Sequence, residues 1–358
     1  MIAPEEGSIG TSEIWLDGSQ HSGSGTLVRF GVALAAVLGR RLRITRARAR
    51  RRQPGLRAQH VAAVRACAEL CGGSARGAEV GSQEIAFAPG ARIHGGHYRF
   101  EIGTAGSATM LALAVLPVAC HADGPVVATI RGGTFQDFAP SAHHLEHVLL
   151  PTLAAMGIEA LLELRLPGYP PGAVGELLLR VQPAHAALAP LVRCEPGRVE
   201  AVEGIALASH LAERRVAARM ADACRAALAA RGLTARIRCV EDEAALRPGA
   251  SLAVWATTTA GARLGADRAG ARGRSSEAIG RFVARTLLED LDSGAATDRH
   301  LADQVVVFAA LAAGTSRFSV PSVTEHIESH VWLVGRFGAR ARCDGRTVEV
   351  EGLGRRLA

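Results

Sequence analysis

Seven arginines lie close together near the amino end of the chain: Arg43, Arg46, Arg48, Arg50, Arg51, Arg52 and Arg57. A guanidinium group is a planar fork of donors that matches two phosphate oxygens, and a row of such groups can hold a polyanion. On a strand predicted over 41–49 and continuing to Arg50, Arg46, Arg48 and Arg50 would share one face, because side chains alternate. The cluster favours a phosphate-binding surface, with a solvated basic edge strand as the alternative.

Two glycine-containing turns, residues 18–26 and 103–107, each precede a predicted helix. Backbone amides at such junctions point outward and favour anions. A turn with no ligand remains the alternative for both.

Histidine is the next candidate for chemistry. His143, His144 and His147 lie together without an HExxH or CxxC partner, so a surface helix face is preferred over a metal site. His326 and His330 are four residues apart and precede an apolar segment, 331–334, that is predicted to be a strand.

Lysine is missing from the chain: all 41 basic residues are Arg. Schiff bases, lysyl-nucleotide intermediates and the phosphate-binding Lys of a P-loop are therefore excluded, together with the enzymes that depend on them. Histidine is left as the nitrogen nucleophile for phosphorus. The seven cysteines show no paired CxxC spacing, which argues against a zinc site and indicates a reducing, cytoplasmic compartment.

Strands and helices alternate along the chain, and a strand–glycine-turn–helix unit occurs three times. Helices are predicted at 26–39, 108–119 and about 141–156, and a further helix, with Val61, Val64, Ala68 and Cys71 at helical spacing, ends at Gly72. This pattern indicates an α/β fold of repeated modules. Between 185 and 277 the sequence pattern changes to Ala-rich helices and looser clusters of charged residues. This change predicts a smaller inserted domain, with 1–184 and 278–358 forming the main domain. No apolar run reaches the roughly 18–20 residues of a membrane span.

Several segments together resemble the RNA 3′-terminal phosphate cyclase family, over about residues 13–350. They are PGLRAQHVAAVRACAELCGG (54–73), GSQEIAFAPG (81–90), GTAGS (103–107), RGGT…AP (131–140), HLADQ (300–304) and VTEHIESHVWLV (323–334). The resemblance implies modules of two helices on a four-stranded sheet, with a smaller α/β domain inserted.

The resemblance also implies a reaction. A histidine attacks the α-phosphorus of ATP and holds AMP as a phosphoramidate. The AMP then passes to an RNA 3′-phosphate, and the neighbouring 2′-hydroxyl displaces it to leave a 2′,3′-cyclic phosphate. The implied partners are ATP, RNA 3′ ends and a divalent metal (Mg²⁺ or Mn²⁺). The oligomeric state is left open, with a homodimer as one alternative.

The family's functional positions fall on particular residues of this chain. The nucleophile falls on His326. The implied nucleotide contacts are Asp303, Gln304, His300 and Pro140. The implied contacts to nucleotide or RNA phosphates are Arg29, Arg48, Arg51, Gln59 and His60.

Four of the family's positions are changed here. Ser22 stands where the family has a metal-binding Glu, Thr26 replaces a Gln, Arg50 a Gly, and His300 a Tyr. A hydroxyl is a poor Mg²⁺ ligand, so the metal site is not located, and Asp17 is one acid that could rebuild it. Two hypotheses follow: an ATP-dependent cyclase, or a non-catalytic RNA-binding homologue that keeps the fold and the arginine surface. Enolpyruvyl transferases, which are built from related modules, are disfavoured by the missing lysine.

Overall fold

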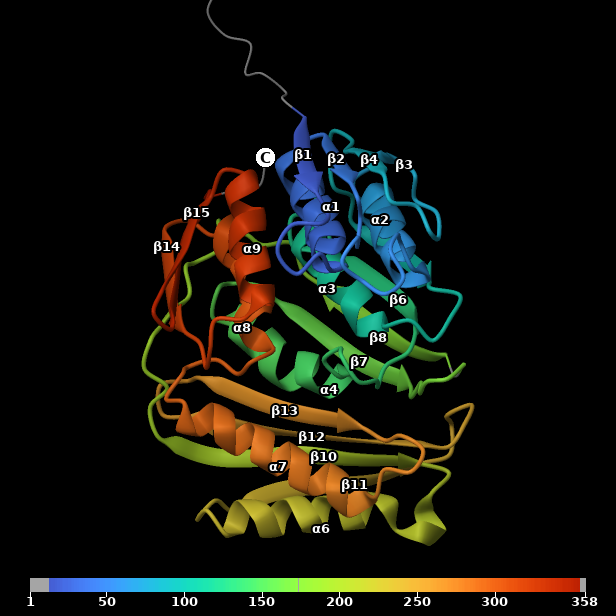
Figure 1. The fold of residues 1–358 in the computed structure, drawn as a ribbon, viewed down its shortest axis with the longest axis vertical. Coiled ribbons are helices and arrows are strands. Elements are labelled where there is room, and N and C mark those ends of the chain that lie inside the picture. Colours follow the sequence, from blue (N-terminus) through green and yellow to red (C-terminus); the bar gives the residue numbers. More distant parts are fainter. Residues whose placement is uncertain (1–12, 173, 355–358) are drawn as a thin grey trace, which may run out of the picture.

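The computed structural model describes residues 13–172 and 174–354 and contains four four-stranded sheets, three in the main body and one in an insertion (Figure 1). None of the helices in these two ranges is both long and apolar enough to cross a membrane. The predicted fold class, α/β modules of helices on four-stranded sheets, is confirmed.

The first module carries the arginine cluster and the first glycine turn. Its elements are β1 (Ile14–Asp17), α1 (Thr26–Leu38), β2 (Leu42–Thr45), α2 (Ala58–Leu70), β3 (Ser74–Arg76) and β4 (Ile85–Ala88). The sheet order is β1-β2-β4-β3, and β1 pairs in parallel with β2. Helix α1 is buried nearly all round, which explains its almost unbroken apolar sequence.

The second module repeats this order of elements. It contains β5 (Gly96–Glu101), α3 (Ala108–Ala119), β6 (Val126–Gly132), α4 (Ala142–His144), a π-helical turn (Leu145–Leu149), α5 (Leu150–Ala154), β7 (Ala160–Leu166) and β8 (Gly175–Val181). Its sheet order is β5-β6-β8-β7.

The third module is interrupted in the sequence by the insertion. It contains β9 (Val192–Arg193), α8 (Leu301–Leu311), β14 (Thr315–Ser319), α9 (Glu325–Arg336), β15 (Arg340–Asp344) and β16 (Thr347–Glu351). Strand β9 pairs with β14 although more than a hundred residues separate them, so the insertion leaves and rejoins the main body within one sheet.

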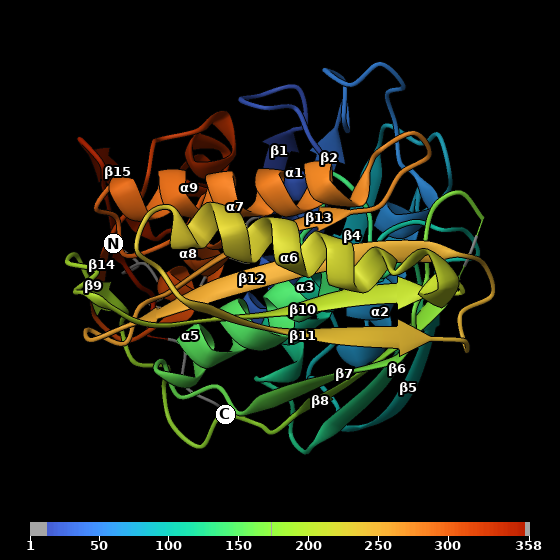
Figure 2. The same cartoon turned by 90° about the horizontal axis from the view of Figure 1, so that it is seen from below.

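The insertion forms its own layered unit. It contains β10 (Val199–Ser209), a 3₁₀ turn (Ala212–Arg214), α6 (Val216–Ala229), β11 (Ala235–Asp242), β12 (Gly249–Thr258), β13 (Arg263–Ala269) and α7 (Ser276–Asp292). Figures 1 and 2 show α6 and α7 side by side on one face of the β11-β10-β12-β13 sheet. The other face lies toward the main body, and α4 contacts β12 and β13 there.

Two hydrophobic cores correspond to these two parts. One runs through all three modules, and the second lies between α6, α7 and the inserted sheet. The second core includes Ile279, Val283 and Leu287 of α7, which lie beyond the boundary predicted at 277. We therefore propose that the inserted domain extends from 199 to 292.

Three predicted elements differ from the structure. The strand predicted over 41–49 ends at Thr45, and Arg46 and Arg48 have positive φ angles in the turn that follows. Segment 331–334 belongs to helix α9 and not to a strand. Its β-branched residues favour a strand, although Ile327, Leu333 and Val334 have helical spacing and form the buried face of α9. The helix predicted over 141–156 is divided by the π-helical turn.

Candidate active site

His326 lies in the first turn of α9, with its side chain exposed. Thr324 caps this helix, and its hydroxyl accepts a hydrogen bond from Ile327 N at 3.2 Å. One turn further on, His330 is buried, and its Nδ1 donates to the His326 carbonyl at 2.8 Å. The predicted nucleophile is therefore presented to solvent on a capped and internally braced turn.

Positive groups surround His326. Partial burial lowers its pKa, and Arg51, Arg29 and His300 lower it further, against the opposing charge of Glu325. An imidazole needs a free lone pair to attack phosphorus, so a lowered pKa keeps the nucleophilic form available at neutral pH.

The first glycine turn is attached directly to α9. Ser22 N donates to Ser329 Oγ at 3.2 Å, and the two hydroxyl oxygens lie 2.8 Å apart. Ser22 Oγ also donates to Ser24 Oγ at 3.1 Å. Ser22, where the resemblance expects an acid, is thus part of a buried hydroxyl network one turn from His326.

Arg29 projects from α1 and is only 5% exposed, and its Nε has no hydrogen-bond partner. Burial lowers its pKa to about 10, so it remains charged at neutral pH, and the Asp303 carboxylate opposes this lowering. Burial raises the pKa of Asp303 to about 7, while Arg29 acts to lower it. The next residue, Gln304, has a buried Oε1 that also lacks a partner. Buried polar atoms of this kind indicate a place for a polar ligand.

His60 lies against the first glycine turn. A Cβ on Gly25 would be 2.0 Å from His60 Nε2 and 2.9 Å from Arg29 Nη1, so only glycine fits here. His60 Nδ1 accepts from Arg57 N at 3.1 Å. Burial, with Arg29 and Arg48 nearby, lowers the pKa of His60 to about 2, so its ring is neutral.

The arginine cluster does not form the regular row predicted from a strand, since the chain turns there. Arg48 donates to the carbonyls of Gln53 and Gly55, which stabilises the turn. Arg46 pairs with Asp17, and Arg50 donates to the His21 carbonyl. Arg51 stays exposed near His326.

Gln59 connects helix α2 to the second glycine turn, 103–107. Its Oε1 accepts a hydrogen bond from Ser107 N at 2.7 Å, at the amino end of α3. The first turn of α2 is therefore fixed to the second glycine turn, 103–107.

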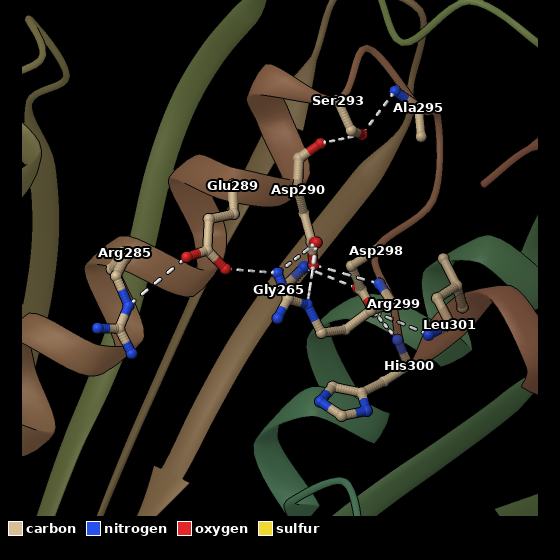
Figure 3. Close-up of polar contacts among 10 residues, drawn as sticks. All are labelled: Gly265, Arg285, Glu289, Asp290, Ser293, Ala295, Asp298, Arg299, His300 and Leu301. Atoms are coloured by element: carbon tan, nitrogen blue, oxygen red, sulfur yellow. Dashed lines mark hydrogen bonds and ion pairs between the residues drawn. The ribbon is translucent and has the colours of Figure 1, made fainter. Parts of the chain in front are cut away.

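The start of α8 is fixed by a buried carboxylate, Asp298 (Figure 3). It accepts from His300 N and Leu301 N, both at 2.8 Å, and from Gly265 N of the inserted sheet at 2.8 Å. Beside it, Arg299 bridges to Glu289 and Asp290 of α7. This network positions His300 and, one turn along, Asp303.

Pro140 is buried just before α4. The next residue, Ser141, caps that helix by accepting from His144 N at 3.1 Å, and its own N donates to Asp267 at 2.7 Å. The rings of His144 and His300 meet edge to face, with centroids 5.9 Å apart. Pro140 is thus connected to the α8 side of the site through α4.

Sequence reasoning missed Ser329 and Asp298, and it included Gly25 only as part of the first glycine turn. Asp298 left a usable signal, because an acid just before the apolar segment 301–311 is typical of the start of a helix. Ser329 and Gly25 act through packing between α1, α2 and α9, which are distant in the sequence, so local patterns could not reveal them.

The residues at the first glycine turn do not fit a resident divalent cation. The hydroxyls of Ser22, Ser24 and Ser329 bond to one another here, and the resemblance places the family's acid at Ser22. The Asp17 carboxylate accepts hydrogen bonds from Ser19 and Gln20 and pairs with Arg46, so both of its oxygens are already engaged within the turn region. Mg²⁺ prefers carboxylate and phosphate oxygens, and this turn supplies neither.

The chain that builds this site matches a known family of RNA-processing proteins. The family model described as RNA 3′-terminal phosphate cyclase matches residues 20–342. The chain belongs to this family.

Relatives named RNA 3′-terminal phosphate cyclase match along almost their whole length. The protein of Thermococcus onnurineus is 40% identical over 95% of this chain and 96% of its own, and that of Methylococcus capsulatus is 39% identical over 93% of each. Among solved structures, the enolpyruvyl transferase NikO from Streptomyces tendae aligns with a TM-score of 0.39 at 12% identity, covering 96% of this chain and 48% of that one. That likeness is too weak to bear on function.

Proposed function

We propose that this protein uses ATP to convert the 3′-terminal phosphate of an RNA into a 2′,3′-cyclic phosphate, with His326 as the nucleophile. The observation that carries the proposal is an exposed histidine of lowered pKa beside Arg29 and Arg51. Family membership supports the same activity, because the relatives are named for it.

In the first step, a ring nitrogen of His326 attacks the α-phosphorus of ATP, and pyrophosphate leaves as the phosphoramidate bond forms. Arg29 offers a buried charge and a free Nε to a phosphate oxygen. Gln304 Oε1 offers an acceptor to a hydroxyl or amino group of the nucleoside. Asp303, His300 and Pro140 complete the proposed nucleotide contacts.

In the second step, an oxygen of the RNA 3′-phosphate attacks the adenylyl phosphorus, and the His326–phosphorus bond breaks. In the third, the 2′-hydroxyl oxygen attacks the activated 3′-phosphorus, its proton is lost, and AMP leaves. AMP is the leaving group that an unactivated phosphate monoester lacks.

The RNA phosphate is assigned to Arg51, Gln59 and His60, of which Arg51 is exposed and His60 is buried. Arg51 is exposed and near His326, so its guanidinium fork is free for a terminal phosphate. Arg48 is assigned a positioning role, because its donors are directed to the carbonyls of its own turn. This turn presents Arg51.

A divalent ion is proposed to enter bound to the phosphates of ATP, since the hydroxyls around Ser22 do not form a cation site. It would offset phosphate charge. All seven cysteines are free thiols, which supports the cytoplasm as the compartment.

The test is covalent labelling of the full chain with α-labelled ATP. We expect a label that survives alkali and is released by acid, as a phosphoramidate is, and that is lost in His326→Ala. His97→Ala, which removes an exposed histidine of β5, should label normally. No label with Mg²⁺, Mn²⁺ or Co²⁺, together with intact RNA binding, would support the non-catalytic homologue instead. Label retained by His326→Ala would overturn the residue assignment.

A further inference from the structure

A second group of histidines lies outside the proposed active site, where α4 continues into the π-helical turn. Glu146 Oε2 is 3.7 Å from His143 Nδ1 and 3.6 Å from His147 Nε2. One ligand atom of each of these three residues lies within 4.8 Å of the other two. His144, between them in the sequence, points elsewhere and pairs with Asp298.

The imidazoles of this group have unsatisfied nitrogens. The His143 side chain is only 8% exposed, and neither Nδ1 nor Nε2 has a hydrogen-bond partner. His147 Nε2 is likewise buried without one. A buried nitrogen without a hydrogen-bond partner destabilises the fold. Several such nitrogens close together indicate that a bound ligand satisfies them. The surface helix face predicted for these histidines is wrong for His143 and His144, which are both buried.

The rings are held in place by the surrounding structure. His147 stacks on Trp255 of β12 with ring centroids 4.1 Å apart, and its carbonyl accepts from Arg263 of β13 at 3.1 Å. The His143 ring packs against Phe135 at 5.3 Å. Such support from neighbouring groups is what fixes the orientation of metal-binding histidines.

We propose that His143, Glu146 and His147 bind a divalent transition-metal ion of the Zn²⁺ type. With metal–ligand bonds of about 2.0–2.2 Å, tetrahedral ligands lie roughly 3.4 Å apart, so small side-chain movements complete the site. The spacing of His143 and His147 is that of the two histidine ligands in His-x-x-Glu-His zinc enzymes, where the Glu is a general base; Glu146 is assigned as a ligand here from its distances to both rings. Turns of the π-helical kind are frequent at functional sites.

The ion would stand at the junction of the main body and the insertion. His147 lines a groove with Glu203, Arg238 and Trp255, so the remaining coordination position faces this groove. Water or an anion attracted by Arg238 would complete the coordination. Since both β12 and β13 contact the His147 turn, the bound ion should stabilise this junction.

Zn²⁺ titration by calorimetry, on the full chain without ATP or RNA, tests the proposal. We expect one ion per chain for the wild type, and loss of that binding in His143→Ala/His147→Ala. The control, His94→Ala/His97→Ala, removes two histidines at the start of the β5 edge and should bind normally. Equal binding by both double variants would overturn the site, as would no binding by the wild type at micromolar Zn²⁺.

X-ray absorption of the Zn²⁺-loaded wild type keeps the proposal testable if the double variant fails to fold. Two imidazole nitrogens and one carboxylate oxygen in a four-coordinate shell are expected. A shell of oxygens alone, or one containing sulfur, would overturn the assignment. Neither measurement uses ATP or RNA, so a negative result here leaves the proposed adenylylation of His326 untouched.

Discussion

A histidine attacks phosphorus only as neutral imidazole, so the positive groups around His326 affect its reactivity directly. Arg29 and Arg51 lower its pKa and, in the proposed reaction, they also face phosphate. The same charges therefore attract the substrate and keep the nucleophile unprotonated.

The pH dependence of labelling follows from this arrangement. The His326 pKa is below the ordinary value of 6.5, so the rate of adenylylation should stay high below that pH before it falls. Arg51→Ala removes a charge that lowers the pKa, so the acid limb of the rate–pH profile should move to higher pH. Single-turnover labelling between pH 5 and 8 measures both. Arg52→Ala is the matched control; a profile unmoved by Arg51→Ala, or moved equally by both changes, contradicts the assignment.

Arg51 should also discriminate between RNA ends. Loss of a charge-assisted hydrogen bond costs about 1.5–3 kcal/mol, so Arg51→Ala should weaken binding of 3′-phosphorylated RNA by roughly tenfold or more. RNA ending in a 3′-hydroxyl should lose much less. Fluorescence anisotropy with the two RNAs measures the difference, and Arg46→Ala serves as control because Arg46 pairs with Asp17. Equal losses for both RNAs would mean that Arg51 acts only through general electrostatics.

At the scale of elements, helices with glycine or polar boundaries were predictable from sequence. The helix predicted at 108–119 matches α3, α1 ends one residue before the predicted Gly39, and α2 ends two residues before the predicted stop at Gly72. The strand predicted for segment 331–334 was wrong. Its β-branched residues favour a strand locally, but packing of α9 on the core makes the segment helical. The strand predicted over 41–49 ends early because residues 46–50 form a turn that packs against the first glycine turn.

The candidate site was predictable as far as single residues allow. His326, Arg29, Arg51 and His300 were all named from sequence, and the structure brings them into electrostatic contact. Their roles remain predictions. The hydroxyl network of Ser22 and Ser329 was not foreseeable, because it joins residues 307 positions apart.

Gly25 is where α1, α2 and the first glycine turn come closest. A Cβ there would meet His60 Nε2 at 2.0 Å, so Gly25→Ala must displace either His60 or the turn. We expect a loss of about 1–3 kcal/mol in unfolding free energy, as for other overpacked positions, together with weaker labelling. Urea unfolding measures the first effect.

The control for this change is Gly335→Ala in α9, where an added Cβ meets nothing within 4 Å. Alanine in a helix is favoured over glycine by about 0.5–1 kcal/mol, so this variant should be unchanged or slightly more stable. A Gly25→Ala protein as stable as Gly335→Ala would show that the turn relaxes freely.

At the scale of the whole molecule, buried charges join the main body to the insertion. His144 of α4 contacts Asp298 at 3.1 Å, and Asp298 also accepts from Gly265 of β13. A second pair between the two parts, Asp137 with Arg274 at 2.8 Å, is partly exposed. These contacts lie between the two hydrophobic cores, so they couple the inserted domain to the start of α8, where the proposed nucleotide contacts begin.

Asp298→Asn tests this coupling through pH. Burial alone would lower the His144 pKa, but Asp298 raises it; burial alone would raise the Asp298 pKa, but His144 and backbone amides lower it to about 2. The wild-type contribution of His144 is therefore complete below pH 6.5 and is lost as pH rises through its raised pKa. That of Asp298 is lost only as pH falls from 3.8 toward 2.

Removing one partner of a buried pair costs about 3–5 kcal/mol, so the variant should be much less stable at pH 5, and the difference should shrink at high pH. Urea unfolding at pH 5, 7 and 9 measures this, with Asp292→Asn, an exposed partner of Arg231, as control. A stability difference independent of pH would mean that Asp298 acts only as the helix cap.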